Sequence, residues 1–243
     1  MVTIIAHRGA RSLAPENTLA AARKAHRLGV DLWEADVAVT ADDQLILMHD
    51  DAMTRTTNVA KLFPERVPAA FSTYSLAEIR SLDAGSWFER DDSFGQVAAG
   101  AVDRQELAGY VGEKVPTLRE AFELTLELDW FLKLADEVKI GPDHLLFSSA
   151  RFEWLKTLRQ RRPDFKVQAV VGLFPDDPMD FTDPFFDTFN PRHTRLSLDQ
   201  MKQQIDLGLK LNPFTVNDDE MIADFLEIGV AGLITDFPQR VPR

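Results

Sequence analysis

Two histidines stand where apolar runs end, and polar residues that suit phosphate chemistry follow each of them. His7 precedes Arg8 and Gly9, and His49 precedes Asp50. Histidine exchanges a proton near neutral pH, arginine supplies a permanent cation, and glycine lets the backbone approach a ligand closely. These residue types together indicate a site for an anionic substrate that carries phosphate.

Two carboxylates, Glu34 and Asp36, lie between the histidines in the sequence. The pattern of residues 32–39 predicts one strand, which would place both carboxylates on the same face about 7 Å apart. Like charges held that close are unfavourable without a cation, and oxygen ligands suit Ca²⁺ or Mg²⁺. The alternative is an edge strand on which both carboxylates face solvent. The flanking apolar residues Trp33 and Val37 make this alternative less favourable.

Alternating strands and helices are expected to position these residues. Asn17 or Thr18 is expected to cap the first helix. The expected strands cover residues 2–6, 32–39, 45–48, 145–149, 167–171, 185–189, 209–216 and 232–236. The expected helices cover residues 19–25, 119–128, 152–161, 198–204 and 219–227. This alternation predicts the parallel α/β class, in which polar chemistry gathers at the carboxyl ends of the strands.

Residues 51–115 have a different composition, rich in Ser, Asp, Gly and Ala, and only one helix is predicted there, at residues 75–82. We expect this segment to be an insertion into the main domain that covers or shapes a substrate pocket.

Composition excludes several classes of function. The net charge of −12 argues against nucleic acid or an anionic membrane as a partner. The chain has no cysteine, which excludes disulfides and thiolate sites. Neither a secretion signal nor an apolar run long enough to cross a membrane is found, so we expect a soluble cytoplasmic protein without membrane insertion. The oligomeric state is left open.

The ordered motifs resemble those of the glycerophosphodiester phosphodiesterase family. The matching stretches are His7-Arg8-Gly9, Pro15-Glu16-Asn17-Thr18, Glu34-Ala35-Asp36, His49-Asp50, Arg55-Thr56-Thr57, Pro116-Thr117-Leu118, Ser148-Ser149, Thr215-Val216-Asn217 and Thr235-Asp236-Phe237-Pro238. The resemblance implies a (β/α)₈ TIM barrel formed by one domain of residues 1–243, with residues 51–115 as the family's small insertion. It also implies hydrolysis of a small glycerophosphodiester to glycerol 3-phosphate and an alcohol.

Carried over by position, the resemblance implies a role for each candidate residue. His7 and His49 would be the acid/base pair, and Arg8 would bind the phosphate. Glu34 and Asp36 would hold a divalent metal, Ca²⁺ or Mg²⁺. The substrate's own glycerol hydroxyl would then attack first, through a cyclic phosphate.

The family's third metal ligand is the glutamate of a Glu-x-Lys strand, and this chain departs from the family there. Glu137-Val138-Lys139 has the right spacing, but too few residues follow it for a parallel crossover. Phe131-Leu132-Lys133 would put phenylalanine in the ligand's place. In the third interpretation, which we favour, residues are missing from the chain at this point.

Two other functions remain as alternatives. A barrel without the third carboxylate would bind a phosphodiester or a metal but turn over poorly. A phospholipase D of the toxin type shares the barrel, but such enzymes are secreted and use disulfides, which this chain without cysteine cannot form.

Overall fold

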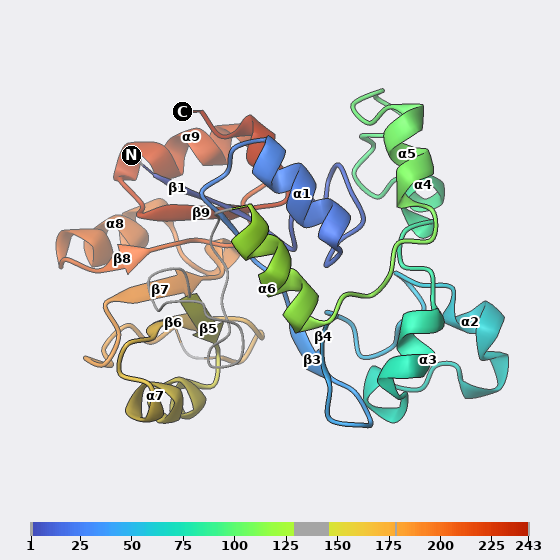
Figure 1. Cartoon of the computed structure of the whole chain (residues 1–243). Coiled ribbons are helices and arrows are strands. Elements are labelled where there is room, and N and C mark those ends of the chain that lie inside the picture. Colours follow the sequence, from blue (N-terminus) through green and yellow to red (C-terminus); the bar gives the residue numbers. More distant parts are fainter. Residues whose placement is uncertain (1, 129–145, 178, 243) are drawn as a thin grey trace. The chain divides into compact units, whose positions relative to one another are not determined.

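The computed structural model describes residues 2–128, 146–177 and 179–242. The chain divides into two compact units (Figure 1). The first comprises Met1–Ile5, Val30–Leu32 and Phe131–Arg243, and the second comprises Ala6–Gly29 and Trp33–Trp130. The five candidate site residues His7, Arg8, Glu34, Asp36 and His49 therefore all belong to the second unit.

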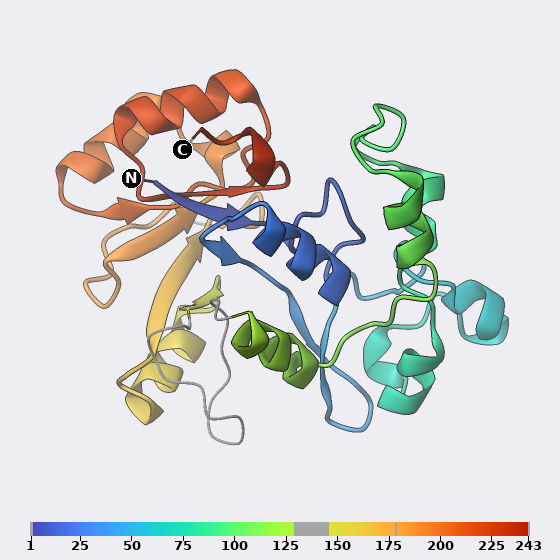
Figure 2. The same ribbon diagram turned by 45° about the horizontal axis from the view of Figure 1, so that its top comes forward.

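The first unit alternates strands with helices. Its four-stranded sheet is parallel and follows chain order: β5 (Leu146–Ser149), β6 (Lys166–Val171), β7 (Thr188–Pro191) and β8 (Lys210–Leu211). A three-stranded sheet has the order β2 (Leu32–Trp33), β1 (Thr3–Ala6) and β9 (Gly232–Thr235), with β1 beside β9 in Figure 2. The helices are α7 (Phe152–Arg161), α8 (Leu198–Asp206) and α9 (Asp219–Ile228), with short 3₁₀ turns at His193–Arg195 and Pro238–Arg240.

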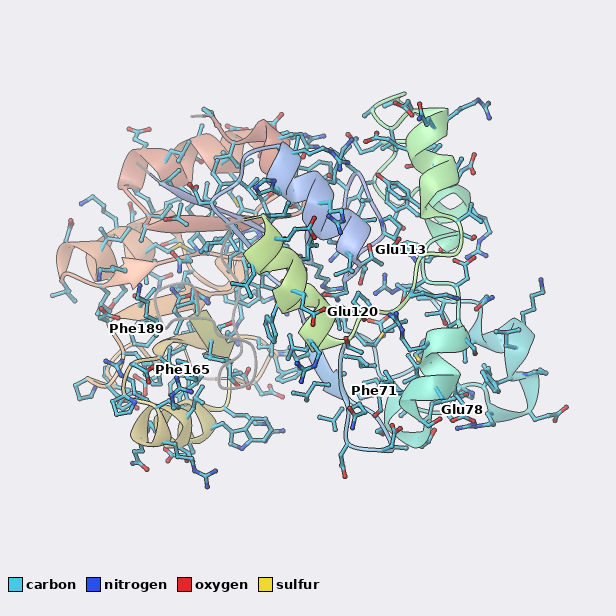
Figure 3. The ribbon with its side chains drawn as sticks, viewed as in Figure 1. Phe71, Glu78, Glu113, Glu120, Phe165 and Phe189 are labelled. Atoms are coloured by element: carbon cyan, nitrogen blue, oxygen red, sulfur yellow. The ribbon has the colours of Figure 1, made fainter. Side chains whose placement is uncertain are left out.

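Aromatic side chains fill the core of the first unit. The Phe147 and Phe165 rings lie 5.2 Å apart, and the Phe186 and Phe189 rings lie 6.0 Å apart. Phe165 precedes β6 and Phe189 lies on β7 (Figure 3). Ring pairs at such separations stabilise the core beyond the area that each ring buries.

The second unit is built on a helix and a hairpin. Helix α1 (Leu19–Arg27) begins at Thr18, whose hydroxyl accepts the Ala21 N–H. Strands β3 (Val37–Val39) and β4 (Leu45–Leu47) pair antiparallel. The other helices are α2 (Val59–Leu62), α3 (Leu76–Ser81), α4 (Trp87–Asp91), α5 (Arg104–Tyr110) and α6 (Leu118–Glu127), with 3₁₀ turns at Pro64–Arg66 and Phe71–Thr73.

Two apolar clusters anchor the 51–115 segment to that framework. One packs α3 and the residues around it against the β3–β4 hairpin, with Ile46, Tyr74 and Ile79 fully buried. The other packs α4 and α5 against α1 and the loop before it, and Tyr110 donates its hydroxyl to the Leu13 carbonyl at 2.9 Å. The segment is therefore a packed part of its unit.

Most of the predicted elements are confirmed, and four predictions are wrong. The single helix expected in the 51–115 segment is joined by three others, all seven residues or shorter. The strand expected at 185–189 begins at Thr188, and the one expected at 209–216 covers only Lys210–Leu211.

The fourth error concerns the carboxylates, because residues 34–36 are not strand. The Asp36 N–H donates to the Asn17 side chain, which takes the place of a neighbouring strand, and β3 then pairs with β4 instead. Glu34 and Asp36 thus lie on a linker between two sheets. Within the described residues, no helix is long and apolar enough to cross a membrane.

Candidate active site

The backbone turns sharply just after β1, at Arg8 and Gly9. Their φ angles of 56° and 81° lie in the left-handed region, which a residue with a side chain rarely adopts. A Cβ atom on Gly9 would come within 2.7 Å of Ala21. The Arg8 N–H donates to Glu34 Oε2 at 3.0 Å, and its carbonyl accepts the Asn17 N–H at 3.1 Å. Such strain persists where the surroundings hold it and is common at functional sites.

Asn17 brackets Asp36 on two sides. Its Nδ2 donates to Asp36 Oδ2 at 3.0 Å, and its Oδ1 accepts the Asp36 N–H at 3.1 Å. Arg8 Nε lies 3.1 Å from the same Oδ2, as an ion pair without hydrogen-bond alignment. The expected choice between two caps is therefore settled: Thr18 caps the helix, and Asn17 orients a carboxylate.

The two carboxylates have the character of a cation site. Burial, together with the charge of Asp36, raises the pKa of Glu34, and His7 and Arg8 oppose that rise only in part. Glu34 uses Oε2 and Asp36 uses Oδ2 for the contacts above. Mg²⁺ in proteins is often held by one or two carboxylates that are completed by water and substrate phosphate. The residues present fit such an ion.

Glu16 gathers three guanidinium groups around one buried carboxylate, of which only 3% is exposed. Arg8 Nη1 donates to its Oε1 at 2.8 Å, and Arg55 donates to both oxygens at 2.7 and 2.9 Å. Arg11 Nε lies 3.7 Å away. Burial alone would raise the pKa of Glu16, but the Arg55 hydrogen bonds and the Arg11 and Arg8 charges lower it to about 2.

His49 is tied to this cluster through its neighbour Asp50. His49 Nδ1 lies 2.6 Å from Asp50 Oδ1, and Arg55 Nε donates to Asp50 Oδ2 at 2.6 Å. Burial raises the pKa of Asp50, yet the hydrogen bonds from Arg55 and His49 outweigh it and leave the pKa lowered. An ionised carboxylate only accepts hydrogen bonds. His49 therefore carries a proton on Nδ1, and Nε2 is the nitrogen available for proton transfer.

His7 joins the same cluster from the other side. Its Nδ1 lies 3.4 Å from Arg11 Nη1, and the Arg11 guanidinium stacks over the Phe94 ring at 5.0 Å. The second unit thus connects all five predicted site residues through hydrogen bonds and ion pairs centred on Glu16.

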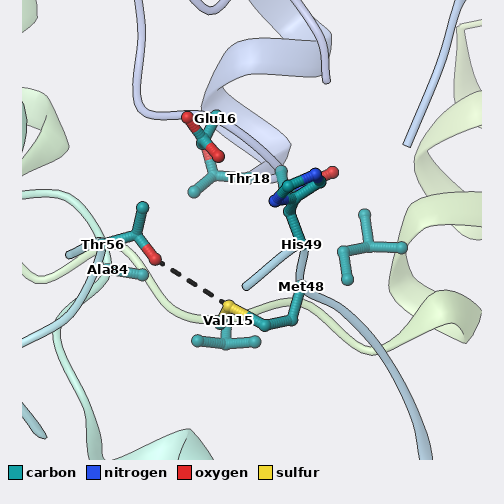
Figure 4. A pocket seen from close by; sticks show the side chains of 9 residues that line it. Glu16, Thr18, Met48, His49, Thr56, Ala84 and Val115 are labelled. Atoms are coloured by element: carbon teal, nitrogen blue, oxygen red, sulfur yellow. Dashed lines mark hydrogen bonds between the residues drawn. The ribbon is translucent and has the colours of Figure 1, made fainter. Parts of the chain in front are cut away.

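Glu16 and His49 also line one small pocket (Figure 4). Thr56 lies on its wall, with its hydroxyl 3.8 Å from Met48 Sδ. The full lining is Glu16, Asn17, Thr18, Leu47, Met48, His49, Thr56, Ala84 and Val115. The candidate acid/base residue His49 thus borders a cavity that it shares with Glu16.

Both positions considered for a third metal ligand, Glu137 and Phe131, lie outside the described residues. Among the residues that the structure does describe, no group of three or more His, Cys, Asp or Glu could hold a metal ion.

Comparison with known families agrees with this geometry. Residues 7–240 match the model of the Glycerophosphoryl diester phosphodiesterase family. The chain belongs to this family. The predicted resemblance is confirmed over nearly the whole sequence.

Individual relatives cover the chain to different extents. It is 28% identical over 258 residues to the glycerophosphodiester phosphodiesterase of Caldanaerobacter subterraneus, with 97% of this chain and 94% of the relative covered. It is 44% identical over 176 residues to the mouse glycerophosphoinositol inositolphosphodiesterase GDPD2, with 72% of this chain covered. That match spans only 31% of the mouse protein, and the match to the human protein has the same extent.

Solved structures show the same fold. A phosphodiesterase from Oleispira antarctica, in complex with the product sn-glycerol-3-phosphate, superposes with a TM-score of 0.77 at 25% identity. The superposition covers 98% of this chain and 94% of that one. The prediction of an α/β (β/α)₈ barrel is confirmed by this likeness.

Sequence reasoning selected five candidate residues but did not indicate the groups that connect them in the structure. Glu16, Asp50 and Arg55 each stand in a matched motif, yet no role was predicted for them. Apart from those motifs their only signal was charge, and only Asp50 adjoins a candidate residue, His49. That signal is weak because charged residues usually lie on a solvated surface.

Proposed function

We propose that this protein is a metal-dependent phosphodiesterase that hydrolyses glycerophosphodiesters to glycerol 3-phosphate and an alcohol. The observation that carries this proposal is the single cluster that joins Arg8, Glu34, Asp36 and both histidines. The family match and the product bound in the Oleispira structure support the substrate class.

The chain's own residues divide the chemistry between them. Arg8 binds the phosphodiester anion, because its guanidinium is a permanent cation suited to phosphate oxygens. One imidazole takes the proton of the attacking glycerol hydroxyl while the other supplies a proton to the departing alkoxide, and water then opens the resulting cyclic phosphate to give glycerol 3-phosphate. Glu34 and Asp36 would hold Ca²⁺ or Mg²⁺, which when bound polarises the phosphoryl oxygens.

Release of glycerol 3-phosphate from glycerophosphocholine tests this function. Wild type, His7→Ala and His49→Ala are compared with and without EDTA, followed by addition of Ca²⁺ or Mg²⁺. Each histidine variant should lose about 10²- to 10⁴-fold in kcat, the range of general acid–base catalysis. His26→Ala, on α1 and outside the cluster, is the control and should keep wild-type turnover. Wild type that releases nothing from a panel of glycerophosphodiesters at saturating metal would refute the proposal.

One observation favours a second candidate, a binding barrel with poor turnover. Among the described residues, no third carboxylate joins Glu34 and Asp36 in a group that could hold a metal ion. A chain with only these two carboxylates would hold Ca²⁺ or Mg²⁺ weakly. Calorimetric titration with metal and the release assay together separate the candidates, because this one predicts weak metal binding together with slow product release.

A cytoplasmic location stays a prediction, which fractionation of the native cells would test.

A further inference from the structure

Alternating charges connect Arg8, which is proposed to bind phosphate, to the acid/base candidate His49. Arg8 contacts Glu16, Glu16 contacts Arg55, and Arg55 contacts Asp50, which holds His49 Nδ1. Each contact in this chain of five residues is 2.9 Å or shorter. Charge-assisted hydrogen bonds of that length are the stronger kind in proteins.

The donors of Arg55 are directed at protein groups. Nε contacts Asp50, while Nη1 and Nη2 each contact one oxygen of Glu16. A guanidinium is a rigid planar fork, so it fixes both carboxylates relative to each other in a way that an ammonium cannot. Although its side chain is 40% exposed, Arg55 is thus built as a bridge between two acids.

Glu16 performs the same task at the other end of the chain. Its carboxylate holds the side chain of Arg8, whose backbone is already held by Glu34. A carboxylate that is 3% exposed and faces three cations cannot move without leaving those cations unpaired, which is costly at a buried site. The direction in which Arg8 presents its remaining donors therefore depends on Glu16.

Resting on the proposed phosphodiesterase function, we infer that Glu16 and Arg55 are positioning residues of the reaction. Glu16 orients Arg8 toward the phosphate, and Arg55, through Asp50, keeps the His49 proton on Nδ1 and the Nε2 atom directed at the substrate. Neither residue needs to touch the substrate itself.

A double-mutant cycle tests the role of Arg55. Arg55→Gln should lower kcat about 10- to 100-fold, the usual effect of removing a partner that orients a site histidine. In a His49→Ala background the same change should alter kcat by less than about threefold, because residues that act as a unit are not additive. KM should rise in both backgrounds, since the hold on Arg8 through Glu16 is loosened in both.

Arg66→Gln is the matched control. Arg66 lies in the same segment, has similar exposure, pairs with Glu78 at 2.6 Å and stacks on Tyr74 at 3.7 Å, away from the pocket. It should leave kcat and KM unchanged. Arg55→Gln with wild-type kcat, or with the same loss in both backgrounds, would overturn the inference while leaving the proposed function standing.

An NMR measurement gives a readout that needs no turnover. Side-chain ¹⁵N–¹H correlation spectra should show neutral His49 protonated on Nδ1 in wild type, with a mixture of the two tautomers in Arg55→Gln. If Arg55→Gln does not fold, Asp50→Asn replaces it in the cycle and in the spectra, since it keeps the pairing of Arg55 with Glu16. A wild-type His49 protonated on Nε2 would refute the positioning role even in an active enzyme.

Discussion

Replacing Glu16 with glutamine should destabilise the protein in a way that depends on pH. In the folded chain the three surrounding arginines lower the pKa of Glu16 from 4.5 to about 2. The unfolded chain therefore binds a proton near pH 4.5, whereas the folded chain binds it only near pH 2. The stabilisation by the carboxylate is complete above pH 4.5 and is lost as the pH falls toward 2. At about 1.4 kcal/mol per pKa unit, it amounts to about 3 kcal/mol.

Urea unfolding of wild type and Glu16→Gln at pH 7, 5, 4 and 3 measures this contribution. The difference in the free energy of unfolding should be about 3 kcal/mol at pH 7 and should shrink below pH 4.5. Other carboxylates titrate in both proteins and cancel in the difference. Glu78→Gln, which breaks a partly exposed pair with Arg66, should show a much smaller difference. A Glu16→Gln difference that stays constant from pH 7 to pH 3 would refute the electrostatic explanation.

Three further predictions follow from single contacts. Glycine adopts the left-handed φ of Asn17 without strain, so Asn17→Gly keeps the backbone conformation but removes the side-chain amide that hydrogen-bonds to Asp36. Calorimetric titration should therefore show Ca²⁺ or Mg²⁺ affinity about 10- to 100-fold weaker. Gly9→Ala places a Cβ 2.7 Å from Ala21 at a φ of 81°, and urea unfolding should show a loss of about 1–3 kcal/mol. Burial raises the pKa of Glu113, which lies between α5 and α6 (Figure 3). Glu113→Gln should therefore be more stable than wild type at pH 7, and unfolding at pH 4 should show that gain reduced as wild type takes up its proton.

The sequence predicted the parts of the fold whose signals are local. Helices α7 and α9 have ten residues each and lie within a residue of their predicted ends. His7 follows β1 directly, as the apolar run before it indicated. These predictions succeed because periodicity, capping and strand ends are written in neighbouring residues.

The errors lie where distant residues decide the structure. The strand predicted through Glu34 and Asp36 is interrupted because Asn17, 19 residues before Asp36, pairs with its backbone. The helices missed in the 51–115 segment are too short for a periodic signal and form because they pack on the hairpin and on α1. The contact between Glu16 and Arg55 joins residues 39 apart, and no local pattern indicates such a pair.

The charge cluster also has a consequence for chain entropy. Its contacts close loops of 8, 26 and 39 residues, from Arg8 to Glu16, Arg8 to Glu34 and Glu16 to Arg55. Closing a loop twice as long costs only about 0.6 kcal/mol more in chain entropy. Each of these loops ends at or before Arg55. Insertions and deletions later in the chain therefore leave every one of these loops at its present length. The loop-closure entropy of the contacts that hold Arg8 and His49 is therefore independent of the length of the later chain.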